Sequence, residues 1–224
     1  FTGLTPDVAV LVASVRALNM HGGVPKAKVA ETNLEALERG CANLDKHIEN
    51  LQKFGLPIVV AINRFPTDDP EELALVKAHC DARGVRSAIS EVVARGGEGG
   101  LELGKAILEA LEHDENHFAP IYDPELPIKE KIGILAREIY GADGVVYTAS
   151  ADKDISRLTK LGFDKLPICM AKTQHSLTDN PDLKGAPKGW ELTIREVRVS
   201  AGAGFLVGLT GEIMTMPGLP KVPA

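Results

Sequence analysis

The stretch LPIVVAINRFPTDDPEE (residues 56–72) predicts a buried strand, a polar turn and the start of a helix in direct succession. Residues 56–62 are almost continuously apolar, which is typical of a strand covered on both faces of a parallel sheet. Asp69 has the position of a helix N-cap and Pro70 that of the first turn, and the two glutamates that follow suit the positive end of the helix dipole. The strand therefore delivers a polar segment, NRFPTDD, to the edge of a sheet.

Two further strands are predicted on either side of this stretch. Residues 7–14 (DVAVLVAS) form an apolar run typical of a strand buried on both faces, and a glycine-containing loop, NMHGGVPK, follows it. Residues 85–89 form a third, shorter strand. Strands that alternate with helices predict an α/β fold with a parallel sheet, flanking helices and right-handed crossovers.

The clearest helix signal lies between the first two strands. Leucine, isoleucine and cysteine recur at spacings of three and four over residues 34–51, which indicates one apolar stripe on a helix. Thr32 and Glu35 have the spacing of a capping box at its start, and Gly55 supplies the stop. A second helix begins at Asp69 and ends at Gly84.

Helices and strands are also predicted in the second half of the chain, but their patterns are less regular. After the glycine-rich turn RGGEGG a helix is predicted over residues 101–112, and the proline-rich residues 118–127 are typical of a linker. The remaining predicted elements are a helix over 128–140, a strand near 145–147, a helix that ends at Gly162 and a strand over 166–171, after which residues 191–199 alternate between polar and apolar. Glycine and proline dominate from Gly202 onward, and no internal repeat is found.

Composition excludes several classes of function. Acidic residues outnumber basic ones by 31 to 25, and no basic block occurs, so nucleic acid is not expected as a partner. No apolar run reaches the roughly 20 residues that cross a bilayer, and no signal-like N-terminus is present. The three cysteines are far apart, which suits a reducing cytoplasm. Because the sequence starts at Phe1, we expect it to continue a longer gene product.

Ligands of open parallel sheets bind at the carboxyl ends of the strands. Polar and cationic residues follow four of the predicted strands, and an anionic substrate would require such an edge. They are Arg16 with His21-Gly22-Gly23, Asn63-Arg64, Ser90-Glu91, and Lys172-Thr173-Gln174-His175.

Two other features have both a functional and a structural interpretation. The turn that contains Gly96 and Gly97 precedes a helix, so in one interpretation its amides bind an anion, and in the other it is a flexible connection. It is not a P-loop, because GxxxxGK[ST] occurs nowhere in the chain. His113 and His117 have the i, i+4 spacing of metal ligands, but no third ligand is apparent, and no metal site is predicted.

The segment NRFPTDD also allows two interpretations. A guanine reader of the GTPase kind needs its acid two residues after the basic residue, and here Phe65 and Pro66 occupy that space. Phe65 next to a strand is either a core residue or an exposed platform for a flat heterocycle. A phenylalanine beside a strand is more often a core residue, but Pro66 holds its neighbour extended in a polar turn and aromatic residues make up only 4% of the chain, so both interpretations stay open.

Several long motifs together resemble the C-terminal part of the formate–tetrahydrofolate ligase family. They are VRALNMHGGVPK, NLEALERGCANLDKHIEN, VVAINRFPTD, SEVVARGGEGG, KLPICMAKTQHSLTDNP and AGAGFLVGLTGEIMTMPGLP. The resemblance implies that residues 1–66 end a P-loop NTPase-like nucleotide-binding domain, that residues 67–117 carry the folate pocket, and that residues 118–224 form a smaller C-terminal α/β domain. It also implies a homo-oligomer and an N-terminal portion that carries the P-loop and is the partner of this segment.

The resemblance further implies the reaction and its ligands. ATP, with Mg²⁺, phosphorylates formate, and an amine nitrogen of tetrahydrofolate attacks the formyl phosphate to give 10-formyltetrahydrofolate. Because the P-loop is absent from the sequence, residues 1–224 alone are expected to give no turnover. The rival interpretation is a non-catalytic folate-binding or oligomerisation module derived from this family.

Within the motifs, the resemblance assigns individual residues. Phe65 matches the phenylalanine that stacks on one face of the pterin-like ring, and Pro66 and Ile89 match apolar walls of the pocket. The family has a tryptophan over the other face, in SEVWAKGGEGG, where this chain has Val93. Because stacking on an aromatic ring is worth about 1–3 kcal/mol per base, folate affinity is expected to be lower by roughly one or two orders of magnitude.

The remaining assignments are weaker matches. Arg16 and His21 lie in a segment that the resemblance places near the reaction centre, around formyl phosphate. Gly22 and Gly23 in that segment suit either the substrate or simple turn geometry. Lys172 at a strand end faces phosphate in one interpretation and solvent in the other.

Overall fold

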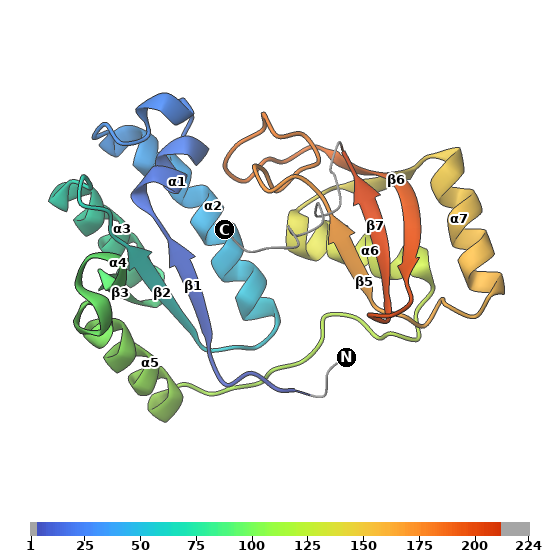
Figure 1. Cartoon of the computed structure of the whole chain (residues 1–224), viewed down its shortest axis with the longest axis horizontal. Helices are drawn as coiled ribbons and strands as arrows, with labels where there is room; N and C mark the ends of the chain where they lie inside the picture. The colour runs from blue at the N-terminus through green and yellow to red at the C-terminus, as the bar shows by residue number, and fades with distance from the viewer. Residues whose placement is uncertain (1–3, 212–224) are drawn as a thin grey trace, which may run out of the picture. The chain divides into compact units, whose positions relative to one another are not determined.

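The computed structural model describes residues 4–211, which form two compact units (Figure 1). The first unit runs to Ile121 and also includes Lys184–Ala186. The second unit consists of Tyr122–Leu183 and the chain from Pro187 on. The last part of the glycine- and proline-rich tail, residues 212–224, lies outside the described residues.

The first unit is built on a three-stranded parallel sheet in the order β1-β2-β3. Its strands are β1 (Ala9–Ala13), β2 (Ile58–Asn63) and β3 (Arg86–Ser90). Ala9 pairs with Ile58 and Ala13 with Ile62, and Asn63 pairs with Ser90 at the other junction. The predicted α/β fold with a parallel sheet is thus confirmed, and the three strands end at one edge.

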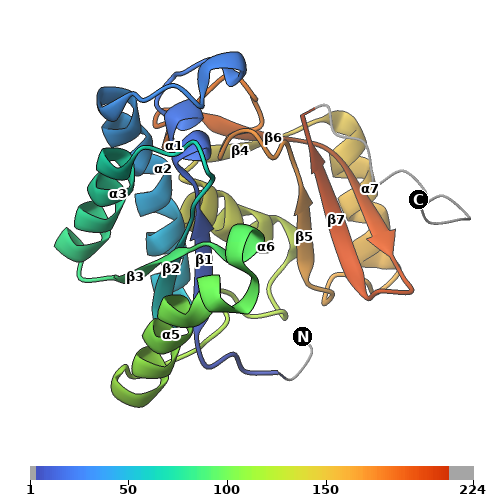
Figure 2. The same ribbon diagram turned by 60° about the vertical axis from the view of Figure 1, so that its left-hand side comes forward.

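Helices of the first unit connect these strands and cover the sheet (Figures 1 and 2). They are α1 (Val15–His21), α2 (Leu34–Lys53), α3 (Pro70–Ala82), α4 (Val92–Arg95) and α5 (Leu101–His113), with 3-10 turns at Lys26–Lys28 and Gly96–Gly100. The main core joins the apolar stripe of α2 to β2 and α3, through residues such as Leu37, Ile48 and Val60, all of which are fully buried.

Three details of the first unit differ from the sequence predictions. The chain after β1 forms α1, with Ser14 as N-cap, where a loop was predicted. The N-cap of α2 is Asn33, which accepts a hydrogen bond from Ala36 N, and Thr32 instead donates to Asp69. Strand β1 is an edge strand and is not buried on both faces, because Val10 and Val12 are exposed.

Two glycines explain how closely α1 and α2 approach. A Cβ on Gly40 would lie 1.9 Å from the carbonyl oxygen of Leu18, and a Cβ on Gly22 would lie 1.8 Å from that of Ala36. No side chain fits at either position, so both glycines are required by packing between the two helices. Gly23, which follows, has a φ of +100°, a value that favours glycine.

The second unit is a mixed four-stranded sheet in the order β4-β6-β7-β5. Its strands are β4 (Gly144–Tyr147), β5 (Ile168–Ala171), β6 (Glu191–Ser200) and β7 (Phe205–Thr210), and its helices are α6 (Ile128–Ile134), which continues as a π-helical segment (Leu135–Tyr140), and α7 (Ala149–Lys160). Strand β7 pairs antiparallel with β6 and parallel with β5. This confirms the smaller α/β domain, although β7 was not predicted.

A buried lysine fastens the loops of the second unit. The ammonium of Lys131, which is 0% exposed, donates to the carbonyl oxygens of Pro124, Asp164 and Leu166 at 3.0, 2.6 and 2.8 Å. Burial lowers the pKa of Lys131. Three carbonyl acceptors satisfy the three N–H groups, so the role of this lysine is structural.

Within residues 4–211, no helix combines the length and the apolar character needed to cross a bilayer.

Candidate functional site

The NRFPTDD segment forms a tight turn directly after β2. The N–H of Asp68 donates to the carbonyl oxygen of Phe65 at 3.0 Å, and Pro66 occupies the second turn position, which its fixed φ suits. The carboxylate of Asp68 reaches back and accepts from the N–H of Phe65 at 2.8 Å. Asp68 is only 7% exposed, so this reciprocal pair fixes the backbone of Phe65 from inside the unit.

Arg16 of α1 meets this turn from the end of the neighbouring strand. Its guanidinium carbon lies 4.2 Å from the centre of the Phe65 ring, and its Nη2 donates to Thr67 Oγ1 at 2.8 Å. Arg16 Nε lies 4.0 Å from Asp68 Oδ1. The arginine therefore covers one face of the ring as a cation–π partner and also ties the turn to α1.

A second cluster joins the end of β2 to the glycine-rich turn after β3. The two oxygens of Glu91 accept from Arg64 and Arg95, each at 3.0 Å. The N–H of Glu91 donates to Gly99 O at 2.9 Å, and a Cβ on Gly99 would lie 2.5 Å from the Glu91 carbonyl. The glycine turn thus folds tightly against Glu91, and both arginines are paired within the protein.

A cavity of about 520 Å³ opens beside this cluster, along β3 and α5. Ile89 lines it, together with the charged side chains Arg64, Lys77, Arg95, Lys105, Glu91, Glu98, Glu102 and Glu109. Four basic and four acidic groups balance there. The cavity itself therefore has no excess of positive charge, and binding of an anionic substrate at the sheet edge stays a prediction.

The four residues assigned to the pterin pocket lie in different surroundings. Phe65 is half-buried in its turn and Ile89 half-buried at the cavity, whereas Pro66 is exposed. Val93, on α4, is 86% exposed. A side chain this exposed contacts little of the protein, so a larger one fits at position 93 without displacing the core.

His21 is half-buried in the first unit. Its Nδ1 accepts from the N–H of Gly185 at 3.2 Å, which leaves the ring proton on Nε2. Desolvation by burial, followed by Lys184 and His47, lowers the pKa of His21 to about 4. His21 is therefore neutral at pH 7, with its ring proton on Nε2.

The residues assigned to anion binding are not brought together in one sheet. Gly96 and Gly97 lie in the turn after β3, with open space beside each. Lys172 follows β5, which belongs to the sheet of the second unit, so the prediction that its strand continues the first edge is wrong. Its ammonium donates to Thr173 O at 2.7 Å and to Ser176 O, and burial lowers its pKa to about 8.

Neither histidine of the predicted i, i+4 pair is placed for a helical metal site. Helix α5 ends at His113, whose Nδ1 bonds to Glu109 O, while His117 lies beyond the helix and pairs with Glu115 at 2.9 Å. Within residues 4–211, no group of three His, Cys, Asp or Glu residues is arranged to hold a metal ion.

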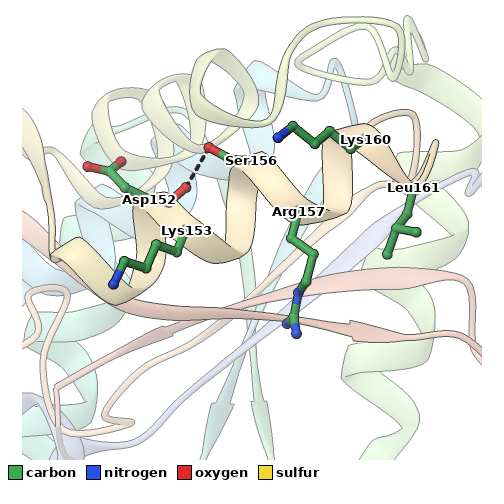
Figure 3. Close-up of a pocket in the computed structure, with 6 residues that line it drawn as sticks. All are labelled: Asp152, Lys153, Ser156, Arg157, Lys160 and Leu161. Atoms are coloured by element: carbon green, nitrogen blue, oxygen red, sulfur yellow. Dashed lines mark hydrogen bonds between the residues drawn. The ribbon is translucent and has the colours of Figure 1, made fainter.

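The second unit carries two further depressions. The one on α7 is lined by Asp152, Lys153, Ser156, Arg157, Lys160 and Leu161, and Figure 3 shows these side chains spread along a single helix. The hydroxyl of Ser156 donates to the carbonyl of Asp152 at 2.9 Å within that helix. The other, of about 740 Å³, is lined by polar loop residues and Arg195. Groups from different elements do not converge on the α7 depression, so it is not a candidate site.

Sequence reasoning missed Thr67 and Asp68, the two residues of the turn that support Phe65. Asp68 accepts from the Phe65 N–H, and Thr67 accepts from Arg16, which covers the ring. The only local signal in the motif was Pro66, because proline is favoured at the second position of a turn, whereas aspartate is favoured at the first position and not at the fourth. The contact between Arg16 and Thr67 spans 51 residues of chain, and no local pattern signals it.

These observations define an α/β protein whose candidate ligand site lies at the carboxyl ends of parallel strands, around an arginine-backed phenylalanine. The family model of formate–tetrahydrofolate ligase matches residues 1–224, the whole chain. The chain therefore belongs to the formate–tetrahydrofolate ligase family, as the motifs indicated.

Proposed function

We propose that the turn after β2 binds the pterin ring of tetrahydrofolate, with Phe65 as the stacking platform. The observation that carries this proposal is that Phe65 is held in two ways: its backbone is fixed by a hydrogen bond, and one face of its ring is covered by a cation. Asp68 fixes the Phe65 N–H, and Arg16 lies 4.2 Å from the ring centre. Because Arg16 covers one face, the ligand takes the opposite face.

The surroundings of the platform set the strength of binding. Pro66 and Ile89 supply apolar contact at the rim, and Val93 stands where the family carries a tryptophan. A valine that is 86% exposed closes the pocket poorly. An aromatic partner would add about 1–3 kcal/mol, so we expect weak but specific binding of reduced folate.

The proposed reaction proceeds in two steps. A formate oxygen attacks the γ-phosphorus of ATP, which releases ADP and leaves formyl phosphate. The N10 amine of tetrahydrofolate then attacks the formyl carbon, phosphate leaves, and the amine loses a proton to give 10-formyltetrahydrofolate. Residues 4–211 offer no metal-binding cluster, and the chain has no GxxxxGK[ST], so we assign none of these residues to Mg²⁺ or ATP.

His21 and Arg16 have limited roles in this proposal. Neutral His21 donates through Nε2 to an oxygen of formyl phosphate and does not serve as the base, since its Nδ1 already accepts from Gly185. Arg16 positions Phe65, and Gly22 serves helix packing. Lys172 is removed from the proposed site because its ammonium is bound to carbonyl oxygens in the second unit.

We further propose that residues 1–224 bind reduced folate but do not turn over alone, and that a P-loop polypeptide of the same family completes the catalyst in the cytoplasm. All three cysteines are free thiols, which suits that compartment. A second candidate is a non-catalytic folate-binding module, which the exposed Val93 favours. The two are distinguished by adding a P-loop portion: restored ligase turnover supports the first.

Calorimetric titration with tetrahydrofolate under reducing conditions tests the proposal. Competition with two fragments of the ligand tells which part binds the platform. We expect 6-methyltetrahydropterin to compete with tetrahydrofolate and p-aminobenzoylglutamate to compete less well. Absence of tetrahydrofolate binding, or formation of formyl phosphate from ATP and formate by residues 1–224 alone, would contradict the proposal.

A further inference from the structure

The depression of about 740 Å³ in the second unit (the polar depression) lies where two parallel strands end. Strands β5 and β7 run parallel, and Figure 1 shows their arrowheads at the same end of the sheet. Thr173 and Asp179 line the depression from the loop after β5, and Gly211, which also lines it, directly follows β7. In open α/β sheets, ligands bind outside the carboxyl ends of the strands. The polar depression therefore has the position of a ligand site, and the folate proposal makes no use of it.

Arg195 belongs to an irregular part of β6. The pairing of β6 with β7 shifts by one residue between Ile194 and Glu196, as in a β-bulge. Burial along the strand shows the same extra residue, because Leu192 and Ile194 are buried two residues apart and Val197 is buried three residues further on. A bulge redirects a side chain, and bulges are common beside active sites. Here the redirected side chain is that of Arg195, which lines the polar depression.

The guanidinium of Arg195 is available to a ligand. Within residues 4–211 it makes neither an ion pair nor a hydrogen bond, whereas Arg198 of the same strand is bound to Glu196 at 2.5 and 2.8 Å. The backbone of Arg195 is fixed, since the hydroxyl of Thr148 donates to its carbonyl oxygen at 2.7 Å. A guanidinium presents a planar fork of N–H donors that matches a carboxylate. Arg195 is therefore placed to bind a carboxylate in the depression.

Asp179 brings the opposite charge to the same depression. Its Oδ2 accepts from the N–H of Thr193 at 3.0 Å, while its Oδ1 makes no hydrogen bond within residues 4–211. A Cβ on Gly211, whose φ is +55°, would lie 2.8 Å from the carbonyl oxygen of Asp179, so the end of β7 packs directly on this residue. Asp179 and Arg195 both line the depression but form no ion pair with each other. A ligand with two opposite charges can pair with both.

The loop that carries Asp179 is held by buried polar groups. Thr178 is 0% exposed; its N–H donates to Ser176 Oγ at 3.0 Å, and its hydroxyl donates to Asn180 O at 2.9 Å. The ammonium of Lys172 donates to the carbonyl oxygens of Thr173 and Ser176. A loop that is fixed before the ligand arrives loses less conformational freedom on binding. The wall of the depression is therefore preorganised.

We propose that the polar depression binds a small zwitterion of the amino-acid or peptide class. The carboxylate of the ligand pairs with Arg195 and its ammonium pairs with Asp179. Thr173 and Asn180 line the same space and offer donors and acceptors to polar atoms between the two charges. The volume of about 740 Å³ lies within the range of about 300–1,000 Å³ that is usual for small-molecule sites. Because a carboxylate accompanies the arginine, a polyanion fits this site less well than a zwitterion.

Nuclear magnetic resonance titration of the whole chain with glycylglycine, a small zwitterion, tests the proposal. The amide signals of Thr173, Asp179 and Gly211 shift and saturate as glycylglycine is added. Acetate and ethylammonium each carry one of the two charges, so each binds at least about tenfold more weakly than glycylglycine. Inorganic phosphate at the same ionic strength also binds more weakly, because Asp179 repels it.

Two variants separate the roles of the two charged residues. Arg195→Gln raises the dissociation constant for glycylglycine at least about tenfold, because it removes the charged hydrogen bonds to the carboxylate. Arg198→Gln is the matched control on the same strand and leaves the constant unchanged. Asp179→Asn keeps an acceptor for the Thr193 N–H but removes the charge, so it weakens glycylglycine about tenfold and does not weaken acetate. Far-UV circular dichroism checks that all three variants are folded.

Three results would overturn the proposal. The first is the absence of saturable shifts at these amides when glycylglycine is added. The second is binding of glycylglycine that Arg195→Gln leaves as tight as in the natural chain. The third is binding of acetate or inorganic phosphate as tight as that of glycylglycine, which would show that the depression recognises an anion and not a zwitterion.

Discussion

The guanidinium of Arg16 lies 4.2 Å from the centre of the Phe65 ring, so a residue that follows β1 supports one that follows β2. The same guanidinium donates to Thr67 and approaches Asp68, whose carboxylate holds the Phe65 N–H. The platform is thus part of a polar network that links α1 to the turn. The orientation of the Phe65 ring therefore depends on Arg16, Thr67 and Asp68 as well as on Phe65 itself.

Arg16→Ala is expected to destabilise the chain as well as to loosen the platform. It leaves the buried carboxylate of Asp68 without its nearest cation, and we expect the free energy of unfolding to fall by about 1–3 kcal/mol. Arg39→Ala, which removes a more exposed arginine paired with Glu35, should cost less than about 1 kcal/mol. Urea unfolding followed by circular dichroism compares the two. Equal losses would show that Arg16 is an ordinary surface residue.

Val93→Trp should restore the second aromatic wall of the pocket. We expect the affinity for tetrahydrofolate to rise by about 5–150-fold, which corresponds to the 1–3 kcal/mol of a stacked ring. The free energy of unfolding should stay within about 0.5 kcal/mol of that of the natural chain because the site is exposed. Leu161→Trp adds a tryptophan to an exposed site of the second unit and controls for nonspecific contact. Unchanged affinity in Val93→Trp would mean that positions 65 and 93 do not enclose the same ligand.

Gly40→Ala tests the close approach of α1 and α2. The added methyl would lie 1.9 Å from the Leu18 carbonyl oxygen, which is backbone and cannot rotate away. Overpacking of this kind costs about 1–3 kcal/mol, and occasionally more. Gly97→Ala is the matched control, because no atom lies within 4 Å of its Cβ position. Thermal unfolding should show a lower midpoint for Gly40→Ala only; similar midpoints would mean that the helices separate without cost.

His21 should make the stability of the chain depend on pH. The pKa of His21 is about 4 in the folded chain and 6.5, the ordinary value for histidine, in the unfolded chain. Between pH 4 and pH 6.5 the unfolded chain therefore binds more protons than the folded chain. The contribution of neutral His21 to the free energy of unfolding is therefore fully present above pH 6.5 and is lost as the pH falls toward 4. His21→Asn keeps an acceptor for Gly185 N–H but does not titrate. Melting temperatures of the natural chain should fall more steeply than those of the variant over this range, and parallel curves would show that His21 is not the group responsible.

Local sequence signals sufficed for the elements whose ends carry strong caps. Strand β2 and helix α3 follow the pattern of residues 56–72 closely, with Asp69 capping the helix through Glu71 N as predicted. Helix α1 was missed because its N-cap, Ser14, directly follows β1 and its last residue, His21, directly precedes the glycines that suggested a loop. Strand β7 was missed because glycines surround and interrupt it.

Contacts between residues far apart in the sequence could not be predicted from the local sequence pattern. An apolar strand looks the same whichever sheet it joins, so the strand pattern alone did not place β5 and Lys172 in a separate sheet; only the family resemblance put residues 118–224 in a domain of their own. The stack of Arg16 on Phe65 joins segments that only the fold brings together. The motif identified Phe65 as a candidate, but its support by Arg16, Thr67 and Asp68 required the structure.

The affinity of Phe65→Ala for tetrahydrofolate, compared with that of Phe118→Ala, tests the central claim most directly. Both variants remove one phenylalanine ring from the first unit, and Phe118 stacks on Phe54 away from the NRFPTDD turn. Calorimetric titration should give a dissociation constant about 5–150-fold higher for Phe65→Ala, since the stacked ring contributes about 1–3 kcal/mol. Phe118→Ala should bind as the natural chain does. Equal dissociation constants for all three proteins would contradict the assignment of Phe65 as the folate platform.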